Sequence, residues 1–158
     1  MPKIKNLPLL ILSTLISEGA GILGAIFTVS AIPTWYAALA KPAFSPPNFV
    51  FGPVWTTLYA LMGISLYLVW ISKTKSRRYA MRLFFLQLGL NVLWSIFFFG
   101  MKNPALAFLE IIALWIAIYL TIKTFLGVSK VASYLLYPYL AWVSFASILN
   151  FSIWILNR

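Results

Sequence analysis

One predicted helix face combines amide and aromatic side chains within an apolar segment. At intervals of four, three and four residues, the sequence places Gln87, Asn91, Trp94 and Phe98. A helix brings residues at these spacings onto one face. Aromatic walls with a few amides that orient a ligand suit binding of a flat, largely apolar molecule.

Two further segments repeat this combination. Trp142 and Ala146 are four residues apart, and Asn150 follows at the next such step. Trp55 and Tyr59 form the same kind of pair, just after Gly and Pro residues that suit the start of a helix. We expect the three helices to present these groups at a comparable depth, around one binding site.

Proline and aromatic residues concentrate in WYAALAKPAFSPPNFVFGPVW, residues 35–55. We expect this connector to fold back over the helix ends as a lid and to contribute Tyr36 and Pro46 to the binding site. Lys41 near its mouth would meet an anionic substituent. A bundle that binds no ligand explains the same residues, because Trp and Tyr are enriched at membrane interfaces and Asn joins helices by hydrogen bonds.

Groups for acid–base or metal chemistry are scarce. The carboxylates are Glu18 and Glu110, which fall in different predicted helices and form no local pair. We expect each to be hydrogen-bonded between helices or to extend partly toward the membrane interface. The chain has no Cys and no His, which excludes disulfides, a histidine-ligated haem and a histidine general base. No cofactor and no metal are expected.

Composition places these residues in a membrane. The chain is 63% hydrophobic and 9% charged, whereas soluble domains average about 25% charged residues. Five apolar runs are each long enough to cross about 30 Å of hydrocarbon as a helix, namely residues 7–32, 49–72, 79–101, 104–122 and 131–156. They lack the alternation of membrane β-strands. We predict an all-α protein with one domain, a five-helix transmembrane bundle.

The net charge of +10 is unevenly distributed. If consecutive spans are antiparallel, nine Lys and Arg residues lie on the side of the N-terminus and three on the other side. The positive-inside rule then predicts a cytoplasmic N-terminus, with the KTKSRR cluster near the anionic leaflet. This distribution argues against nucleic-acid binding. An odd number of spans without an internal repeat also argues against an alternating-access carrier.

The chain resembles the TspO family, also called translocator proteins, tryptophan-rich sensory proteins and peripheral benzodiazepine receptors. The resemblance covers nearly the whole chain and rests on five predicted spans together with WYAALAKPAFSPPNFVFGPVWTTLYALMG, QLGLNVLWSIFF and YLAWVSFASILN. It implies a five-helix bundle, often a homodimer, that binds porphyrins such as protoporphyrin and haem, and benzodiazepine or isoquinoline-carboxamide drugs. The positions that match the family's pocket under the first loop are Tyr36, Pro46, Trp55, Asn91, Trp94, Trp142 and Ala146.

Three functions follow from this resemblance. The favoured one is a binding or sensory protein that captures a porphyrin. The second is a light- and oxygen-dependent enzyme that degrades porphyrin, for which the resemblance implicates Trp55 and Trp142. The third, ranked last, is a transporter of porphyrin or sterol.

The C-terminal segment departs from the mitochondrial members of the family. Their cholesterol-recognition segment needs a Tyr followed by a basic residue, but here Phe151 and Ile155 stand at those places. This argues against high-affinity cholesterol binding and favours a bacterial cell membrane. Ser17, Gly21 and Ala25 form a stripe of small residues that suits close helix packing, either within one bundle or between the subunits of a homodimer.

Overall fold

The computed structural model describes residues 6–158. Within this part of the chain, five helical stretches are long and apolar enough to cross a membrane, which confirms the predicted all-α class and the number of spans. The helices are α1 (Leu7–Thr28), α2 (Phe51–Trp70), α3 (Arg77–Ser95), α4 (Pro104–Leu126), α5 (Lys130–Tyr134) and α6 (Tyr137–Leu156). Short π-helical turns cover Ile32–Tyr36 and Ile96–Gly100, and a 3-10 turn covers Asn48–Val50.

Capping Asn and Ser side chains, two of them close to a proline, define several helix starts. The Asn6 side chain accepts a hydrogen bond from the backbone N–H of Leu9 at 3.0 Å, and Asn103 accepts one from Leu106 at the same distance. A proline lies in the first turn of both helices, where its missing N–H costs nothing. Ser129 caps α5 in the same way. These starts are therefore determined locally by the sequence.

The fifth membrane span is divided between α5 and α6. Pro138 lies in the first turn of α6. It has no N–H to donate, and inside a continuous helix its ring would collide with the carbonyl four residues earlier, that of Tyr134. Residues 135–136 therefore separate the two helices, whereas the sequence suggested one run over residues 131–156.

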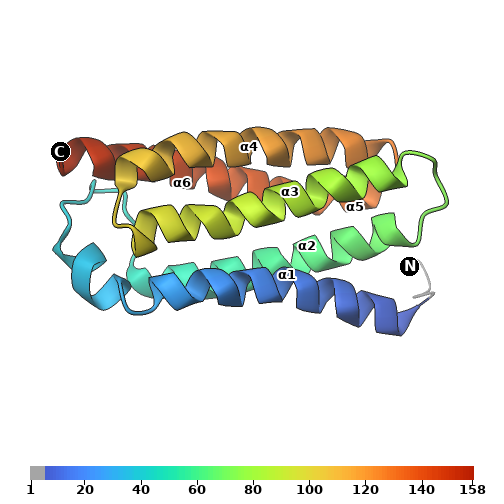
Figure 1. Cartoon of the computed structure of the whole chain (residues 1–158), viewed down its shortest axis with the longest axis horizontal. Coiled ribbons are helices and arrows are strands. Elements are labelled where there is room, and N and C mark those ends of the chain that lie inside the picture. The colour runs from blue at the N-terminus through green and yellow to red at the C-terminus, as the bar shows by residue number, and fades with distance from the viewer. Residues whose placement is uncertain (1–5) are drawn as a thin grey trace.

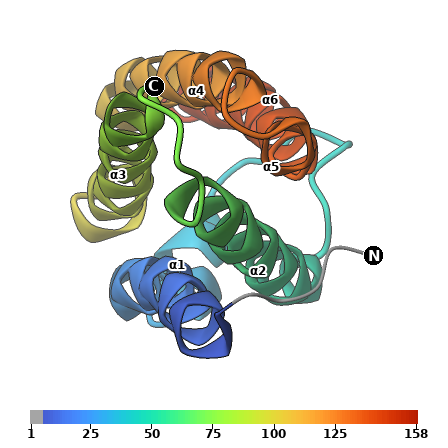
Figure 2. The same ribbon diagram turned by 90° about the vertical axis from the view of Figure 1, so that its right-hand side faces the viewer.

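The helices form a ring with the order α1, α2, α5–α6, α4 and α3, and consecutive spans run antiparallel (Figures 1 and 2). Residues 29–50, which we call the lid loop, lie at the same end of the bundle as the C-terminus (Figure 1). We call this end the lid end. At the opposite end, the ring is filled by large apolar side chains, and the rings of Phe84 and Phe125 stack with centroids 6.0 Å apart.

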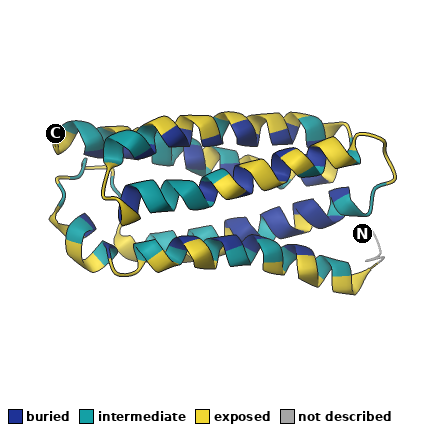
Figure 3. Cartoon of the chain, in the orientation of Figure 1, coloured by how far each residue is buried: buried dark blue, intermediate teal, exposed yellow. Residues whose placement is uncertain are grey.

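Apolar side chains cover the outside of the ring as well as its core (Figure 3). Met62, Leu66 and Phe84 are fully buried, whereas Leu15, Ile22 and other large apolar residues of α1 are more than half exposed. An outer surface of this kind is unfavourable in water and favourable against lipid acyl chains.

Charged residues separate between the two ends of the bundle. The end opposite the lid carries Lys73, Lys75, Arg77, Arg78, Arg82, Lys123 and Lys130, and the lid end carries Lys41, Lys102 and Arg158. Lys3 and Lys5, which also entered the charge prediction, lie outside the described residues. The described basic residues are therefore more numerous at the end opposite the lid, as the sequence indicated. The orientation of the protein in the membrane stays a prediction.

Candidate functional site: an aromatic cavity under the lid loop

A cavity of about 320 Å³ lies inside the ring toward the lid end, between α1, α2, α3 and α6. Small-molecule sites in proteins typically enclose about 300–1,000 Å³. Of the residues expected from the sequence to form a site, the cavity brings together Tyr36, Trp55, Tyr59, Asn91, Trp94, Trp142 and Ala146. Pro46 is not among the lining residues.

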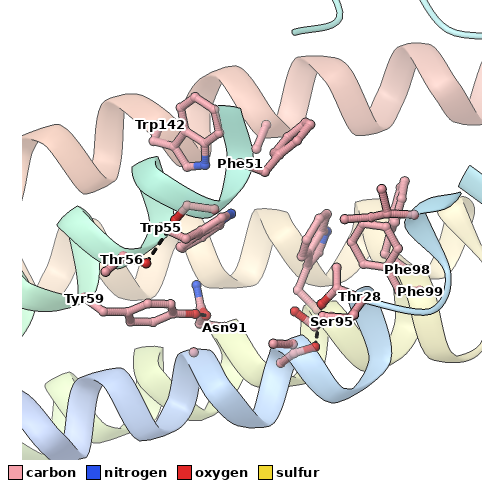
Figure 4. Close-up of a pocket in the computed structure, with 18 of the residues that line it drawn as sticks. Thr28, Phe51, Trp55, Thr56, Tyr59, Asn91, Ser95, Phe98, Phe99 and Trp142 are labelled. Atoms are coloured by element: carbon pink, nitrogen blue, oxygen red, sulfur yellow. Dashed lines mark hydrogen bonds between the residues drawn. The ribbon is translucent and has the colours of Figure 1, made fainter. Parts of the chain in front are cut away.

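Eight of the residues that line the cavity are aromatic, and Figure 4 shows several of their rings facing the cavity. On one side, Trp142, Trp55 and Tyr59 lie one below another, and Phe98 and Phe99 lie on the other side. The ring of Trp55 stacks on that of Tyr59 with centroids 5.4 Å apart. These ring faces offer a flat apolar ligand surfaces on which to stack.

The lid loop closes the lid end of the cavity. Its π-helical turn places Tyr36 against Phe51 and Phe99, with ring centroids 6.3 Å and 5.8 Å away. Tyr36 is only 3% exposed, and burial raises the pKa of its phenol, an effect that the neighbouring Ser45 hydroxyl partly offsets. The turn therefore contributes a neutral aromatic cover to the cavity.

Lys41 has a structural role in the lid loop. Its ammonium donates hydrogen bonds to the carbonyl oxygens of Tyr36, Leu39 and Ala37 at 2.7, 3.2 and 3.4 Å. It also lies 4.8 Å from the centroid of the Tyr36 ring. Lys41 was expected to meet an anionic ligand group at the mouth, but here its charge neutralises the carbonyl dipoles at the end of the turn.

The side-chain amides around the cavity are used by the bundle itself. The Tyr59 hydroxyl donates to Asn91 Oδ1, and Asn91 Nδ2 donates to the Tyr139 hydroxyl at 3.0 Å. The Trp94 indole donates to Asn150 Oδ1 at 3.0 Å, and Asn150 Nδ2 donates to the Pro104 carbonyl at 2.8 Å. Both amides therefore hold aromatic side chains of the wall in fixed positions.

Other polar groups of the wall remain available to a ligand. Among the described residues, neither the buried indole nitrogen of Trp142 nor the buried hydroxyl of Tyr36 has a hydrogen-bond partner. Glu18 makes no hydrogen bond with any described residue, and it is the one charged residue among the described residues that line the cavity. The site therefore offers an indole donor, a phenol hydroxyl and one carboxyl group in a largely apolar space.

Small residues of α1 make room for the cavity. Gly21, Gly24, Ala25 and Thr28 line it from one side. A Cβ atom built on Gly21 would lie 2.5 Å from the Tyr59 ring, so any other residue there would have to displace that ring. Within the predicted stripe of small residues, Gly21 and Ala25 thus face the cavity inside a single bundle.

The cavity reaches the outer surface between α1 and α2. Ile22 of α1 and Val29, which directly follows α1, line the cavity and are 66% and 70% exposed. Gly52 and Thr56 of α2 also line it and are exposed. The two helices touch closely further from the lid, where a Cβ on Gly63 would lie 2.5 Å from Thr14 Cα. They diverge toward the lid end and leave a side opening there.

Only some residues of the predicted face of α3 line the cavity. Asn91, Trp94 and Phe98 line the cavity, whereas Gln87 is buried below it, with neither amide atom hydrogen-bonded to a described residue. Glu110 is 7% exposed on α4 and also lies outside the cavity lining. Glu18 was not expected in the site. It is followed at intervals of three, four and three residues by Gly21, Ala25 and Thr28, however, and this spacing indicates that the four residues share one helix face.

Known proteins resemble this chain over most of its length. The TspO/MBR family profile matches residues 13–155. A tryptophan-rich protein TspO of Archaeoglobus fulgidus is 49% identical over 152 residues, 96% of this chain and 99% of that protein. One from Chlorobaculum tepidum is 46% identical, with 87% and 88% covered. The translocator protein of Homo sapiens is 41% identical, with 76% and 73% covered. This chain therefore belongs to the TspO/MBR family of membrane proteins.

Proposed function

We propose that this protein is an integral membrane receptor or sensor that binds porphyrins, such as protoporphyrin and haem, in the aromatic cavity under the lid loop. The observation that carries the proposal is a space of about 320 Å³ walled by the rings of Trp55, Tyr59, Trp94 and Trp142. Stacking on such rings suits a flat aromatic ligand. Drugs of the benzodiazepine and isoquinoline-carboxamide type would occupy the same space.

The side opening allows the cavity to bind a ligand that is larger than the enclosed volume. A porphyrin macrocycle that stacks inside the ring would extend one edge between α1 and α2, past Ile22 and Thr56. That edge would meet lipid near the membrane surface, where polar substituents are tolerated. Apolar ligands dissolved in the bilayer would also reach the cavity by this route.

A cavity-filling substitution tests the proposal. Ala146 lines the cavity and Ala113 faces outward on α4, so Ala146→Phe and Ala113→Phe add the same side chain inside and outside the site. Protoporphyrin binding is measured by quenching of Trp fluorescence and by the shift of the porphyrin absorbance band. We expect Ala146→Phe to abolish binding and Ala113→Phe to retain it. Equal binding by both variants contradicts a site in this cavity.

A second candidate is light- and oxygen-dependent degradation of the bound porphyrin. The observation in its favour is that Trp55 and Trp142 both line the cavity, with the Trp142 N–H unpartnered. The excited porphyrin and dioxygen would supply the oxidising chemistry, and the protein would supply orientation and an oxidisable indole. Loss of the porphyrin absorbance band under light, with a product band that needs the protein, would distinguish degradation from binding alone.

We also propose a cytoplasmic N-terminus, a homodimer and a location in a prokaryotic cell membrane. The orientation is supported by the seven basic residues at the end opposite the lid against three at the lid end. Because the chain has no Cys, single substitutions Lys75→Cys and Phe44→Cys give clean labels for the two ends. In intact cells, an impermeant maleimide should label the Phe44→Cys protein and spare the Lys75→Cys protein. Cross-linking of purified protein tests the dimer.

A further inference from the structure

Glu18 occupies the deep end of the cavity. On α1 the lining residues run from Glu18 through Gly21 and Ala25 to Thr28, and Glu18 is the one furthest from the lid loop. Tyr59 of α2 and Asn91 of α3 line the same deep end. The carboxyl group therefore lies near the middle of α1, at the depth of the membrane interior rather than at its surface.

No positive charge balances this carboxyl group within the cavity. None of the described lining residues is a Lys or an Arg. Lys41 belongs to the lid loop and donates its hydrogen bonds to backbone carbonyls. Glu110, the other carboxylate, lies outside the lining. An acidic ligand group thus finds a carboxyl group and no cation at the deep end.

We propose that Glu18 sets the charge selectivity and the orientation of the bound tetrapyrrole, an inference that rests on the proposed porphyrin binding. A porphyrin whose acidic groups lie along one edge, such as protoporphyrin, binds with that edge toward the side opening and the lid end. A porphyrin with acidic groups on every pyrrole ring, such as coproporphyrin, binds more weakly, because at least one carboxylate then faces Glu18.

The physical reason is the cost of placing two carboxyl groups close together away from water. Like charges several ångströms apart repel strongly where the effective dielectric constant is low. One group must otherwise take up a proton to relieve the repulsion. The other described lining groups, including the hydroxyl and amide side chains, carry no charge that would compensate. A discrimination of about tenfold in Kd corresponds to about 1.4 kcal/mol and is within reach of such a pair.

Titrations of full-length protein in lipid nanodiscs test this inference. Protoporphyrin, coproporphyrin and coproporphyrin tetramethyl ester are each titrated against wild type, Glu18→Gln and Glu110→Gln. Each ligand has the same membrane partition for all three proteins, so the ratio of variant to wild-type Kd isolates the protein's contribution. Glu110→Gln replaces the other carboxyl group, which lies outside the cavity lining, by the same amide and is the matched control.

We expect Glu18→Gln to tighten coproporphyrin binding about tenfold while protoporphyrin and the ester change less than about twofold. Glu110→Gln should leave all three affinities unchanged.

Two results would overturn the assignment of Glu18. One is an unchanged coproporphyrin affinity in Glu18→Gln while protoporphyrin still binds; the other is an equal gain in Glu110→Gln. The proposed porphyrin binding would survive both. If wild type binds neither protoporphyrin nor the ester, the proposed function fails, and the inference fails with it.

Discussion

The side chain of Asn157 pairs with the backbone of Ala40 through both of its polar atoms. The Ala40 N–H donates to Asn157 Oδ1 and Asn157 Nδ2 donates to the Ala40 carbonyl, each at 2.9 Å. The two residues are 117 positions apart in the chain. The end of α6 is thereby fastened to the lid loop, and the loop is held over the cavity by a contact remote from the ligand site.

Replacing Asn157 by Leu should loosen the lid loop. Both hydrogen bonds are lost, and because they are exposed we expect a cost of about 1–2 kcal/mol. Ligand dissociation should accelerate by about tenfold, with little change in the helical content of the protein. Stopped-flow displacement of bound protoporphyrin measures the rate. Asn48→Leu, an exposed substitution elsewhere in the same loop, is the control, and equal rates in the two variants would rule out the contact as a latch.

The close contact between α1 and α2 makes Gly63 sensitive to substitution. A Cβ there would lie 2.5 Å from Thr14 Cα and 3.0 Å from Thr14 N, which are backbone atoms that cannot rotate away. We expect Gly63→Ala to destabilise the protein by about 1–3 kcal/mol and to lower its melting temperature in detergent. Gly89→Ala adds a methyl group where nothing lies within 4 Å and should keep or raise the melting temperature, because alanine is the better helix former. A similar loss in both variants would contradict the tight contact.

Asn91 should act together with Tyr59. Asn91→Leu removes the acceptor of the Tyr59 hydroxyl and the donor to Tyr139. Because buried hydroxyl groups are left unpaired, we expect a loss of about 1–3 kcal/mol in stability and weaker porphyrin binding. Tyr59→Phe alone should cost less. The double variant Asn91→Leu, Tyr59→Phe should lose less stability than the sum of the losses of the two single variants, because both substitutions remove the same hydrogen bond. Additive losses in melting temperature would show that the two side chains act independently.

Photochemistry, if the protein performs it, should depend on the indole of Trp142. Trp142→Phe keeps an aromatic ring against Phe51 and Phe145, its neighbours at 6.1 and 5.5 Å, so we expect the fold and protoporphyrin binding to persist. Light-driven loss of the porphyrin band should slow by at least about tenfold, because phenylalanine is harder to oxidise than indole. Trp154→Phe changes an indole on the same helix that packs on Phe108, outside the cavity. Equal photolysis rates in wild type and Trp142→Phe would exclude the indole mechanism.

Local sequence patterns determined the elements of this fold. Five long apolar runs can satisfy their backbone hydrogen bonds in lipid only as helices, and the described chain has five helices of that length. Asn6 and Asn103, each close to a proline, mark helix starts, because capping and the tolerance of proline depend only on adjacent residues. The division of the fifth span could also have been read from Pro138, since the clash of its ring is equally local.

Spacing along single helices identified much of the cavity wall as well. Trp55 and Tyr59, like Trp142 and Ala146, lie on one helix face because of the helical period alone, and both pairs line the cavity. Gln87 has the same periodicity as Asn91, yet it lies below the cavity. Periodicity fixes the direction of a side chain around its helix axis, and only packing with other helices decides at which depth the interior is hollow.

Tertiary structure alone decided which distant residues meet. Asn91 bonds to Tyr59 and Tyr139, which belong to two other helices. Lys41 bonds to carbonyl groups of its own loop, and Asn157 bonds to Ala40. All of these contacts depend on how the helices are placed in the ring. Glu18 became a cavity residue because α1 and α2 touch at Gly63 and diverge toward the lid. Such contacts arise from the relative position of separate helices, and no repeat or spacing within one helix encodes that position.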